Sequence, residues 1–317
     1  MTLEPAVRAH LDAMSRRNLS GLDPAARRPL MRAEIDRMFM LFGQPGPPVS
    51  DVRDHRVPVE GGEITVRIYH PEASRPVAGR PAIHVLLHGG GWTGGSIDEL
   101  VSDATARHRA VGAGCVVAAV EYRLAPEHRF PVAVHDVIAA VRWVRDHASL
   151  IGADGRVLTL GGASAGANLA AAAVVGADDL GLRALILEVS ALDLSRGPVD
   201  GPLEEVLSGY LGDRSRGQDP LASPLLEPDP GRFPETVLLA AELDPLRRDS
   251  ERFAERLSAA GVEVHLTCYK GAMHGSPILT GTWPTARRWQ QDVIDHLRRI
   301  NGSASGASTA VDVVGVI

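Results

Sequence analysis

Cysteine and aromatic residues are scarce in this sequence. Two cysteines, Cys115 and Cys268, occur among 317 residues, so neither a disulfide framework nor a zinc site is indicated. Each lies in an apolar run, and we expect both to be small buried side chains. Aromatic residues make up only 4% of the chain, so a binding pocket is expected to consist mainly of Leu, Val and Met side chains.

A long apolar run and an excess of positive charge are also lacking. No stretch reaches the roughly 18 consecutive apolar residues that span a membrane, and the chain does not begin with a basic segment followed by an apolar one. The net charge is −6 and the isoelectric point is about 6.1. Both values argue against nucleic-acid and anionic membrane partners, which favour a basic surface. We therefore expect a cytoplasmic protein that acts on a small molecule.

Short apolar runs alternate with helical patterns through most of the chain, of which 44% is hydrophobic and 23% is charged. The runs that suit buried strands are 83–87, 115–120, 157–160, 185–189, 237–241 and 262–269. Helical spacing of apolar residues falls at 98–112, 131–149, 165–176, 246–260 and 284–300. This alternation predicts an α/β fold in which helices cover both faces of a mainly parallel sheet. A hairpin that turns at 60–62 would supply an antiparallel edge.

The first 48 residues are predicted to form two amphipathic helices. Apolar residues recur at helical spacing in two segments, 7–14 and 31–42. The apolar stripe of the second segment either serves only for packing or belongs to a cover that presents Met38 and Phe42 to a ligand.

Two further regions do not follow the alternation. The stretch 195–230 is rich in Gly, Pro and Asp and has one helical piece at 203–211, which is typical of a lid or of a tolerated loop. After a body at 49–301, the tail at 302–317 begins like a flexible linker and ends in an apolar segment, 311–317, to which we assign no structure.

A glycine-rich turn lies between the apolar run at 157–160 and a run of alanines. It reads Gly162-Ala163-Ser164-Ala165-Gly166, the pattern of a nucleophile elbow, in which a serine occupies a sharp strand-to-helix turn. Strained backbone angles at the serine require small residues two positions before and after it, so that strand and helix can cross closely. By itself the pentapeptide also suits an ordinary glycine-rich turn of an α/β protein.

Three consecutive glycines follow the strand predicted at 83–87, in the loop His88-Gly-Gly-Gly-Trp92. Parallel sheets bind ligands at the carboxyl ends of their strands, where this loop begins. Glycines have no side chain to pack, so a run of them indicates that backbone N–H groups must approach something closely, such as a developing oxyanion. His84 and His88 share a strand face, but no further ligand follows nearby, so a metal site is not favoured.

Five segments together resemble the hormone-sensitive-lipase-like esterases of the α/β-hydrolase fold. The segments are HGGGW at 88–92, EYRLAPEHRFP at 121–131, GASAG at 162–166, ELDPL at 242–246 and HG at 274–275. Their order and spacing match those of the family over roughly residues 50 to 300. The resemblance implies a mainly parallel eight-stranded sheet with helices on both faces, and a helical cap formed by 1–48 and 195–230.

The resemblance also implies a role for each matching position. Ser164 would be the nucleophile, His274 the base and Asp244 the acid, because a serine hydroxyl needs an imidazole to take its proton and a carboxylate to orient that imidazole. The implied oxyanion hole consists of backbone N–H groups, those of Gly90, Gly91 and Ala165. Large apolar side chains expected to contact substrate are those of Trp92, Met38 and Phe42. No cofactor and no metal is implied.

Other residues compete for two of these roles. The competing carboxylates are those of Asp193, Asp249 and Glu242, and the competing imidazoles are those of His265 and His296. His265 lies in a predicted strand and His296 in the last predicted helix, where packing or solvated roles are expected. In the segment 121–131 the polar side chains are expected to tie loops together beneath the site.

The chain departs from the family's pattern at three positions. Ala163 stands where a polar residue usually precedes the serine, and Ala167 stands where a glycine usually follows the second glycine. Ser276 replaces a large ring near the base, which would enlarge the pocket or make it more polar. None of these changes removes a reacting group.

These patterns favour a serine carboxylesterase that hydrolyses short- to medium-chain esters through an acyl-enzyme intermediate. Alternatives with the same residues are a deacylase, lactonase or cyclase of a specialised metabolite, and an amidase or peptidase. A binding protein that has lost the catalytic histidine is an alternative of another class, although His274 is present. A homodimer formed through 262–269 and 284–300 is also possible.

Overall fold

The computed structural model describes residues 22–71, 80–196 and 201–302, together with Arg8 and Leu11. The predicted first helix at 7–14 and the apolar tail at 311–317 lie outside these residues, apart from the two named positions. Within the described part of the chain, no helix combines the length and the apolar character needed to cross a membrane.

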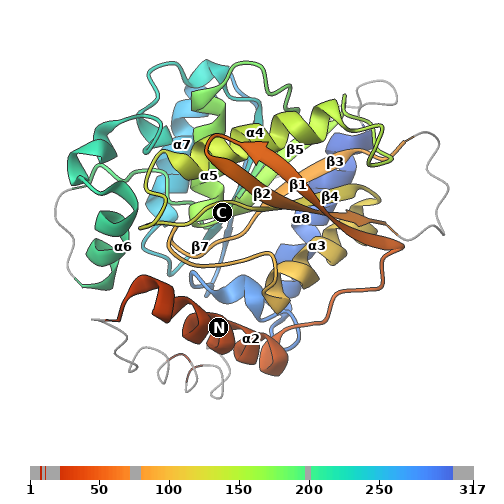
Figure 1. Cartoon of the computed structure of the whole chain (residues 1–317), viewed down its shortest axis with the longest axis horizontal. Coiled ribbons are helices and arrows are strands. Elements are labelled where there is room, and N and C mark those ends of the chain that lie inside the picture. Colours follow the sequence, from red (N-terminus) through yellow and green to blue (C-terminus); the bar gives the residue numbers. More distant parts are fainter. Residues whose placement is uncertain (1–7, 9–10, 12–21, 72–79, 197–200, 303–317) are drawn as a thin grey trace.

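An eight-stranded sheet runs through the molecule in the order β1-β2-β4-β3-β5-β6-β7-β8 (Figure 1). The strands are β1 (Asp51–Val59), β2 (Gly62–His70), β3 (Ile83–Leu87), β4 (Val116–Glu121), β5 (Leu158–Ala163), β6 (Ala184–Glu188), β7 (Glu235–Ala241) and β8 (Val264–Tyr269). The hairpin of β1 and β2 is antiparallel, β2 pairs antiparallel with β4, and the other neighbours are parallel. The predicted mainly parallel sheet with an antiparallel edge is confirmed.

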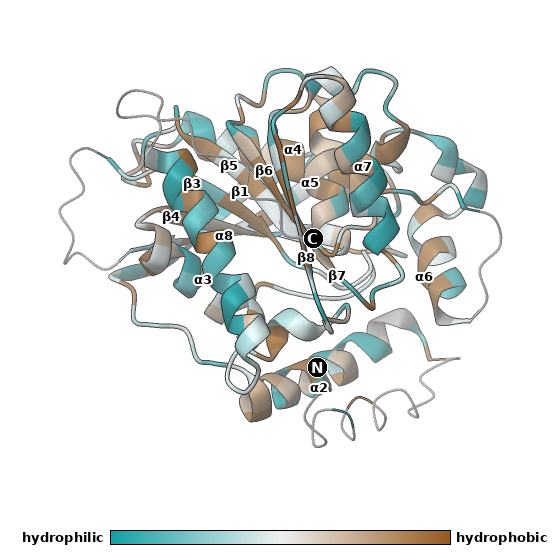
Figure 2. Ribbon diagram, turned by 180° about the vertical axis from the view of Figure 1, so that it is seen from behind, coloured by the Kyte–Doolittle hydropathy of each residue, from teal (hydrophilic) through white to brown (hydrophobic). Residues whose placement is uncertain are grey.

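Helices cover both faces of this sheet. The described helices are α2 (Pro24–Phe42), α3 (Leu100–Ala113), α4 (Val132–Asp146), α5 (Ala165–Gly176), α6 (Pro202–Leu211), α7 (Arg247–Ala259) and α8 (Pro284–Gly302). Side chains of α4, α5 and α7 share one large core cluster with the sheet, whereas α3 and α8 pack against the opposite face in two smaller clusters. Figure 2 shows mainly apolar strands between helices, with polar surface on α3 and α7.

The burial of the strands follows their place in the sheet. All five residues of β3 are buried, as expected for a central parallel strand with helices on both sides. Strand β8 lies at the edge of the sheet and is only partly covered, so Leu266 and Cys268 are exposed. The expectation that both cysteines are buried is therefore correct for Cys115 and wrong for Cys268.

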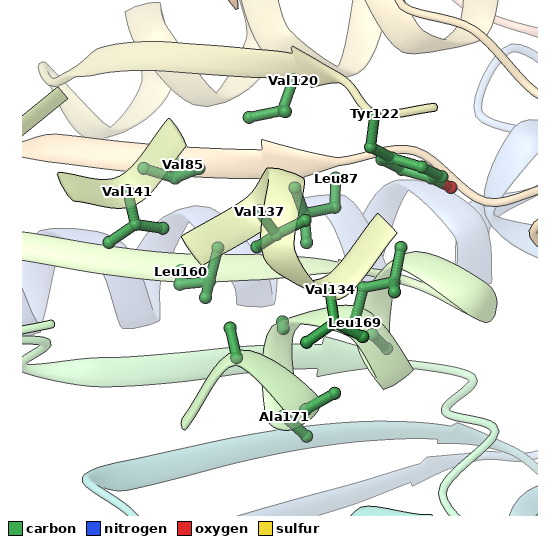
Figure 3. Close-up of a cluster of buried hydrophobic side chains, with 14 of the residues drawn as sticks. Val85, Leu87, Val120, Tyr122, Val134, Val137, Val141, Leu160, Leu169 and Ala171 are labelled. Carbon is green, nitrogen blue, oxygen red and sulfur yellow. The ribbon is translucent and has the colours of Figure 1, made fainter. Parts of the chain in front are cut away.

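Helix α5 carries the alanines that follow the glycine-rich turn. Its side chains from Ala165 to Val174 are all buried, between the sheet and α4. Short side chains let this helix lie close to β5, and Figure 3 shows Leu169 of α5 beside Val134 of α4 in the large core cluster. This dense layer supports the turn that precedes α5.

Helix α2 begins earlier than the apolar spacing predicts, at Pro24 rather than near residue 31. Proline suits the first turn of a helix, and the stretch 25–30 has only one large apolar residue, Leu30, so it adds no apolar stripe. Figure 1 shows α2 and α6 at the same end of the molecule. Both helices contribute to the cavity described below.

Candidate active site

Ser164 occupies the turn between β5 and α5. Its backbone has φ 56° and ψ −115°, a left-handed conformation that is strained for any residue except glycine. The N–H of Ser164 donates to the carbonyl oxygen of Glu188 at 2.8 Å, which ties the turn to the end of β6. The side chain is thereby held above the carboxyl edge of the sheet.

The two glycines of the pentapeptide are required by close packing. A Cβ added to Gly162 would lie 2.6 Å from the carbonyl oxygen of Leu87, and one added to Gly166 would lie 2.5 Å from that of His88. Both contacts are too short for real atoms and involve backbone, which cannot swing aside. The expected close crossing of strand and helix is confirmed.

Three side chains from three loops form a continuous hydrogen-bonded chain. Nε2 of His274 lies 2.9 Å from Oγ of Ser164, and its Nδ1 lies 2.7 Å from Oδ2 of Asp244. The Asp244 side chain is 1% exposed and that of His274 is 42% exposed. This geometry suits an imidazole that donates its Nδ1–H to a buried carboxylate and accepts the serine proton at Nε2.

The two partner loops follow β7 and β8 and are fastened to each other. The N–H of Leu243 donates to the carbonyl oxygen of Ala272 at 2.8 Å, and the N–H of Gly271 donates to the Glu242 carboxylate at 2.7 Å. The second oxygen of Asp244 accepts the N–H of Leu246 at 2.9 Å. Carboxylate and imidazole are therefore positioned by backbone contacts as well as by each other.

The competing acids and bases lie in other networks. Asp193 pairs with Arg252, and Asp249 accepts the N–H groups of Leu192 and Asp193. His265 lies beside His296, with ring centres 5.2 Å apart, and it also contacts Glu235. None of these imidazoles and carboxylates is described in contact with Ser164.

Ser276 supports the turn that carries the histidine. Its hydroxyl accepts the N–H of Met273 at 2.8 Å, and the residue is buried. The serine that replaces a large ring therefore braces the loop, and it is not among the described residues that line the cavity. Ala163 does line the cavity, whereas Ala167 is fully buried in α5.

The glycine loop after β3 lies directly against the serine turn and the cap. A Cβ on Gly90 would lie 2.2 Å from the carbonyl oxygen of Gly94, and one on Gly91 would lie 2.9 Å from Val206 of α6. Both glycines have positive φ, 119° and 60°. The loop is also held by the Tyr122 hydroxyl, which donates to the carbonyl oxygen of His88 at 2.8 Å.

Gly90 and Gly91 line the same cavity as Ser164. The third predicted donor, Ala165, is the first residue of α5, a position at which the backbone N–H has no acceptor within the helix. The glycine loop and the start of α5 therefore both lie next to Ser164, and the oxyanion hole stays a prediction.

A cavity of about 770 Å³ surrounds Ser164 and His274. This volume is in the range of small-molecule sites, about 300 to 1,000 Å³. Its cover comes from Met31 and Ile35 of α2 and from Leu203 and Val206 of α6. The apolar part of the cover therefore consists of aliphatic side chains and methionine, as the scarcity of aromatic residues predicts, and Arg28 and Arg32 of α2 add two charged groups to it.

The three large apolar residues predicted to contact substrate lie elsewhere. Trp92 is buried, donates its Nε1–H to Asn168 at 3.2 Å and stacks on Tyr210. Met38 is buried, and Phe42 packs against the cluster on the α8 face. None of the three lines the cavity within the described residues, because the apolar stripe of α2 covers the cavity only near its beginning and packs on the body further along.

Helix α2 is fastened to the loops of the site by Arg28. Its Nε donates to the carbonyl oxygen of Thr93 at 2.8 Å, and NH2 donates to that of Ala125 at 2.7 Å. The guanidinium also pairs with Glu127. Arg123 of the same segment, 121–131, pairs with buried Asp136. Both Arg123 and Glu127 therefore tie loops together.

Sequence reasoning did not identify two charged residues that line the cavity, Arg109 and Glu188. Arg109 lies in α3, and Glu188 is the last residue of β6; the two side chains form an ion pair and are only 5% and 6% exposed. A charged residue at the end of an otherwise apolar strand is a weak signal that could have drawn attention to Glu188. Glu99 also lines the cavity, and burial, together with the Asp36 carboxylate, raises its pKa to about 7.

A cluster with the residue types of a metal site lies away from the cavity. Among the described residues it consists of Glu235, Glu263 and His265, and Arg299 already pairs with Glu235 there. The imidazole of His84 on β3 is hydrogen-bonded to Thr159 of β5 and to Arg109 of α3. No such cluster of three possible ligands lies beside Ser164 in the described part of the chain.

Comparisons with known proteins agree with this geometry. The model of an alpha/beta hydrolase fold family matches residues 84–278. An arylesterase of Saccharolobus solfataricus is 31% identical over 295 residues, which cover 87% of this chain and 94% of the relative. Esterase LipI of Mycobacterium tuberculosis is 34% identical over 272 residues, which cover 81% and 84%.

Solved structures show the same likeness. A hyperthermophilic esterase from the archaeon Pyrobaculum calidifontis has a TM-score of 0.82 at 28% identity, with 95% of this chain and 99% of that chain covered. The likeness therefore extends over nearly the whole chain. With a family model that covers more than half of the sequence, the chain belongs to the hormone-sensitive-lipase-like esterases of the alpha/beta hydrolase fold.

Proposed function

We propose that this chain is a serine carboxylesterase in which Ser164, His274 and Asp244 form the catalytic triad. The observation that carries the proposal is the hydrogen-bonded chain from the Ser164 hydroxyl through the imidazole to a buried carboxylate. The esterase relatives support the reaction type.

In the first half of the reaction, Ser164 Oγ attacks the ester carbonyl carbon while His274 Nε2 takes the serine proton. The bond to the alcohol oxygen then breaks, and the alcohol leaves with that proton. In the second half, His274 takes a proton from water, the hydroxide oxygen attacks the acyl-enzyme, and the proton returns to Ser164 as the carboxylic acid is released. Asp244 keeps the imidazole in the required tautomer throughout.

The backbone N–H groups of Gly90, Gly91 and Ala165 are proposed to hold the oxyanion. They come from a loop and a helix start that are fixed by close packing on Val206 and β3. Preorganised donors of this kind stabilise the transition state, and the loss of one typically lowers the rate by about 10² to 10³. No cofactor enters this mechanism.

Esters with short to medium chains are the proposed substrates. The cavity of about 770 Å³ exceeds what an acetyl group needs, and its cover by α2 and α6 limits access for long chains. We propose that residues 1–48 and 195–230 act as the cap of a catalytic domain at 49–301, with 302–317 as a tail. The cover supplied by Met31 of α2 and Val206 of α6 supports this division.

The central test is labelling by a fluorophosphonate probe, combined with hydrolysis of para-nitrophenyl esters of graded acyl length. The wild type should be labelled, and Ser164→Ala should abolish both labelling and turnover. Ser149→Ala is the matched control, because Ser149 is exposed and bonded to Arg80 away from the cavity; it should retain both. Labelling that survives in Ser164→Ala would refute the assignment of the nucleophile.

The cellular location and the assembly state are further predictions. We propose a cytoplasmic protein that does not bind nucleic acid, consistent with a net charge of −6. The edge position of β8 and its neighbour α8 support a homodimer formed through them. Cell fractionation and sedimentation velocity test the two predictions separately.

A further inference from the structure

One part of the cavity, called the branch below, is lined by α3 and by the ends of the strands that this helix covers. Leu86 of β3 and Ala119 of β4 are paired in the sheet and pack in one cluster with Ala106 and Ala110 of α3, so they face that helix. Both also line the cavity. The branch therefore extends over the α3 side of the sheet.

A buried ion pair forms part of the wall of this branch. Glu188 is the register partner of Ala163, the residue just before the serine, and both line the cavity. The guanidinium of Arg109 donates to one oxygen of Glu188, and the Nε1–H of Trp289 donates to the other at 2.8 Å. The carboxylate is thus held by two neighbours while it borders the cavity.

The network continues along the α3 face of the sheet. NH1 of Arg109 lies 3.2 Å from Nε2 of His84, and Nδ1 of His84 lies 3.0 Å from the hydroxyl of Thr159. Burial, followed by the charge of Arg109, holds the pKa of His84 well below its ordinary value. A neutral His84 accepts from Arg109, so the guanidinium is fixed on the side away from the cavity.

The stability of the fold does not explain why this pair is there. Replacement of a buried ion pair by packed apolar residues is often neutral or stabilising, because two charges must be removed from water to form the pair. The surrounding clusters on this face consist mainly of Ala, Val, Leu and Ile side chains, with a few Trp and Tyr rings, and apolar groups of this kind could close the space without charge. A role toward a ligand in the adjoining cavity accounts for the charges.

The chemistry of the wall defines what it would recognise. A guanidinium has five N–H donors, and the described bonds to Glu188 and His84 leave donors for a ligand. Three carboxylates line the cavity together with three guanidinium groups, those of Glu99, Glu121 and Glu188 with those of Arg28, Arg32 and Arg109, so the lining carries no excess charge that would attract an ionised ligand group. A neutral oxygen that accepts a hydrogen bond suits this wall.

We propose that Arg109 and Glu188 determine substrate specificity by selecting esters that carry a second, uncharged oxygen, such as a ketone, ether or hydroxyl, a few bonds from the ester carbonyl. This inference rests on the proposed function, because Ser164 must be the attacking group. The oxygen would accept a hydrogen bond from Arg109, and Glu188 would keep the guanidinium in place. With an ester that lacks this oxygen, the remaining N–H donors of Arg109 would lose water and find no acceptor.

The test compares isosteric esters that differ by one oxygen. On the acyl side, para-nitrophenyl levulinate is compared with para-nitrophenyl pentanoate; on the alcohol side, methoxyethyl butanoate is compared with butyl butanoate. Each kcat/KM is divided by the rate of alkaline hydrolysis of the same ester, which removes differences in intrinsic reactivity. The oxygenated member should be favoured roughly tenfold or more in at least one pair, and that pair shows which part of the ester occupies the branch.

The same ratio is then measured in a double variant that removes both charges, Arg109→Met with Glu188→Leu. The preference for the oxygenated ester should fall about tenfold, and a general loss of activity cancels in the ratio. The control is Arg123→Met with Asp136→Leu, which removes an ion pair between a half-buried arginine and a buried carboxylate, neither of which lines the cavity. Its ratio should match that of the wild type.

Two results would overturn the inference. One is the absence of a preference for the oxygenated ester in either pair in the wild type. This result does not depend on whether a variant folds. The other is a double variant with the wild-type ratio. The proposed esterase function would stand in both cases, provided that the wild type hydrolyses the plain esters and Ser164→Ala does not.

Discussion

The two faces of the sheet are built differently. On the face covered by α4, α5 and α7, a large cluster of apolar side chains packs without interruption around residues such as Leu160 and Leu169 (Figure 3). On the face covered by α3 and α8, the apolar clusters are smaller, and Arg109, Glu188 and His84 lie buried there. Ser164 stands at the boundary, since its turn belongs to α5 and its N–H bonds to Glu188.

This difference separates two requirements on one sheet. Close-packed apolar groups stabilise a fold with few constraints on chemistry, whereas a buried ion pair contributes little net stability and fixes positions and charge. We infer that the α5 face supports the serine turn and that the α3 face shapes the choice of substrate. Changes on the two faces should therefore affect different measurements.

The largest effect is expected when one partner of the ion pair is removed. Glu188→Leu leaves the Arg109 guanidinium buried without its carboxylate, and the free energy of unfolding should fall by about 3 to 5 kcal/mol. Adding Arg109→Met should restore it to the wild-type value or raise it by about 1 to 4 kcal/mol. Urea unfolding measures both values.

A different outcome of this double-mutant cycle would contradict the contrast between the two faces of the sheet. Equal losses in the single and the double variant would show that the α3 face depends on the pair for stability, like an ordinary core. The Arg123 and Asp136 pair on the other side of the sheet provides the matched cycle.

A smaller loss of stability is expected from a truncation on the apolar face. Leu169 is fully buried in α5, and Leu169→Ala should lower the free energy of unfolding by about 2 to 5 kcal/mol through lost contacts and a cavity. The ratio between oxygenated and plain esters should not change, because Leu169 does not line the cavity. A changed ratio would mean that the faces are not separate.

The smallest effect concerns acid sensitivity. The pKa of His84 is held well below its ordinary value of 6.5 by burial and by Arg109. Below about pH 6.5 the unfolded chain therefore binds a proton at His84 that the folded chain does not bind. The contribution of this site to the free energy of unfolding is fully present above about pH 6.5 and falls as the pH drops below it. The expected slope is up to about 1.4 kcal/mol per pH unit.

Urea unfolding between neutral and mildly acidic pH measures this slope. His84→Leu should flatten it, and His135→Leu, which changes an exposed imidazole on α4, should leave it as in the wild type. The same slope in the wild type and His84→Leu would contradict a buried neutral His84.

The order of strands and helices could be predicted from the sequence because apolar spacing and glycine-rich turns are local signals. The triad residues could be named because Ser164, Asp244 and His274 lie in short motifs at strand ends. The steric need for Gly162 and Gly166 followed from the same local geometry and agrees with their contacts.

The shape of the pocket could not be predicted in this way. Apolar spacing placed Met31, Ile35, Met38 and Phe42 on one stripe, yet only the first two line the cavity, since the stripe does not tell where along a helix the cover ends. Arg109 and Glu188 are 79 residues apart and belong to no local motif. Their proximity arises only when α3 packs on the sheet.

The bonds of Arg28 to Thr93 and Ala125 have a consequence for the working cycle of the protein. Lifting α2 from the cavity must break these bonds. The segment that follows the glycine loop then loses a support. Thermodynamic coupling is reciprocal, so whatever orders that loop also favours the closed position of α2. Any displacement of α2 would therefore also loosen the chain next to the glycine loop.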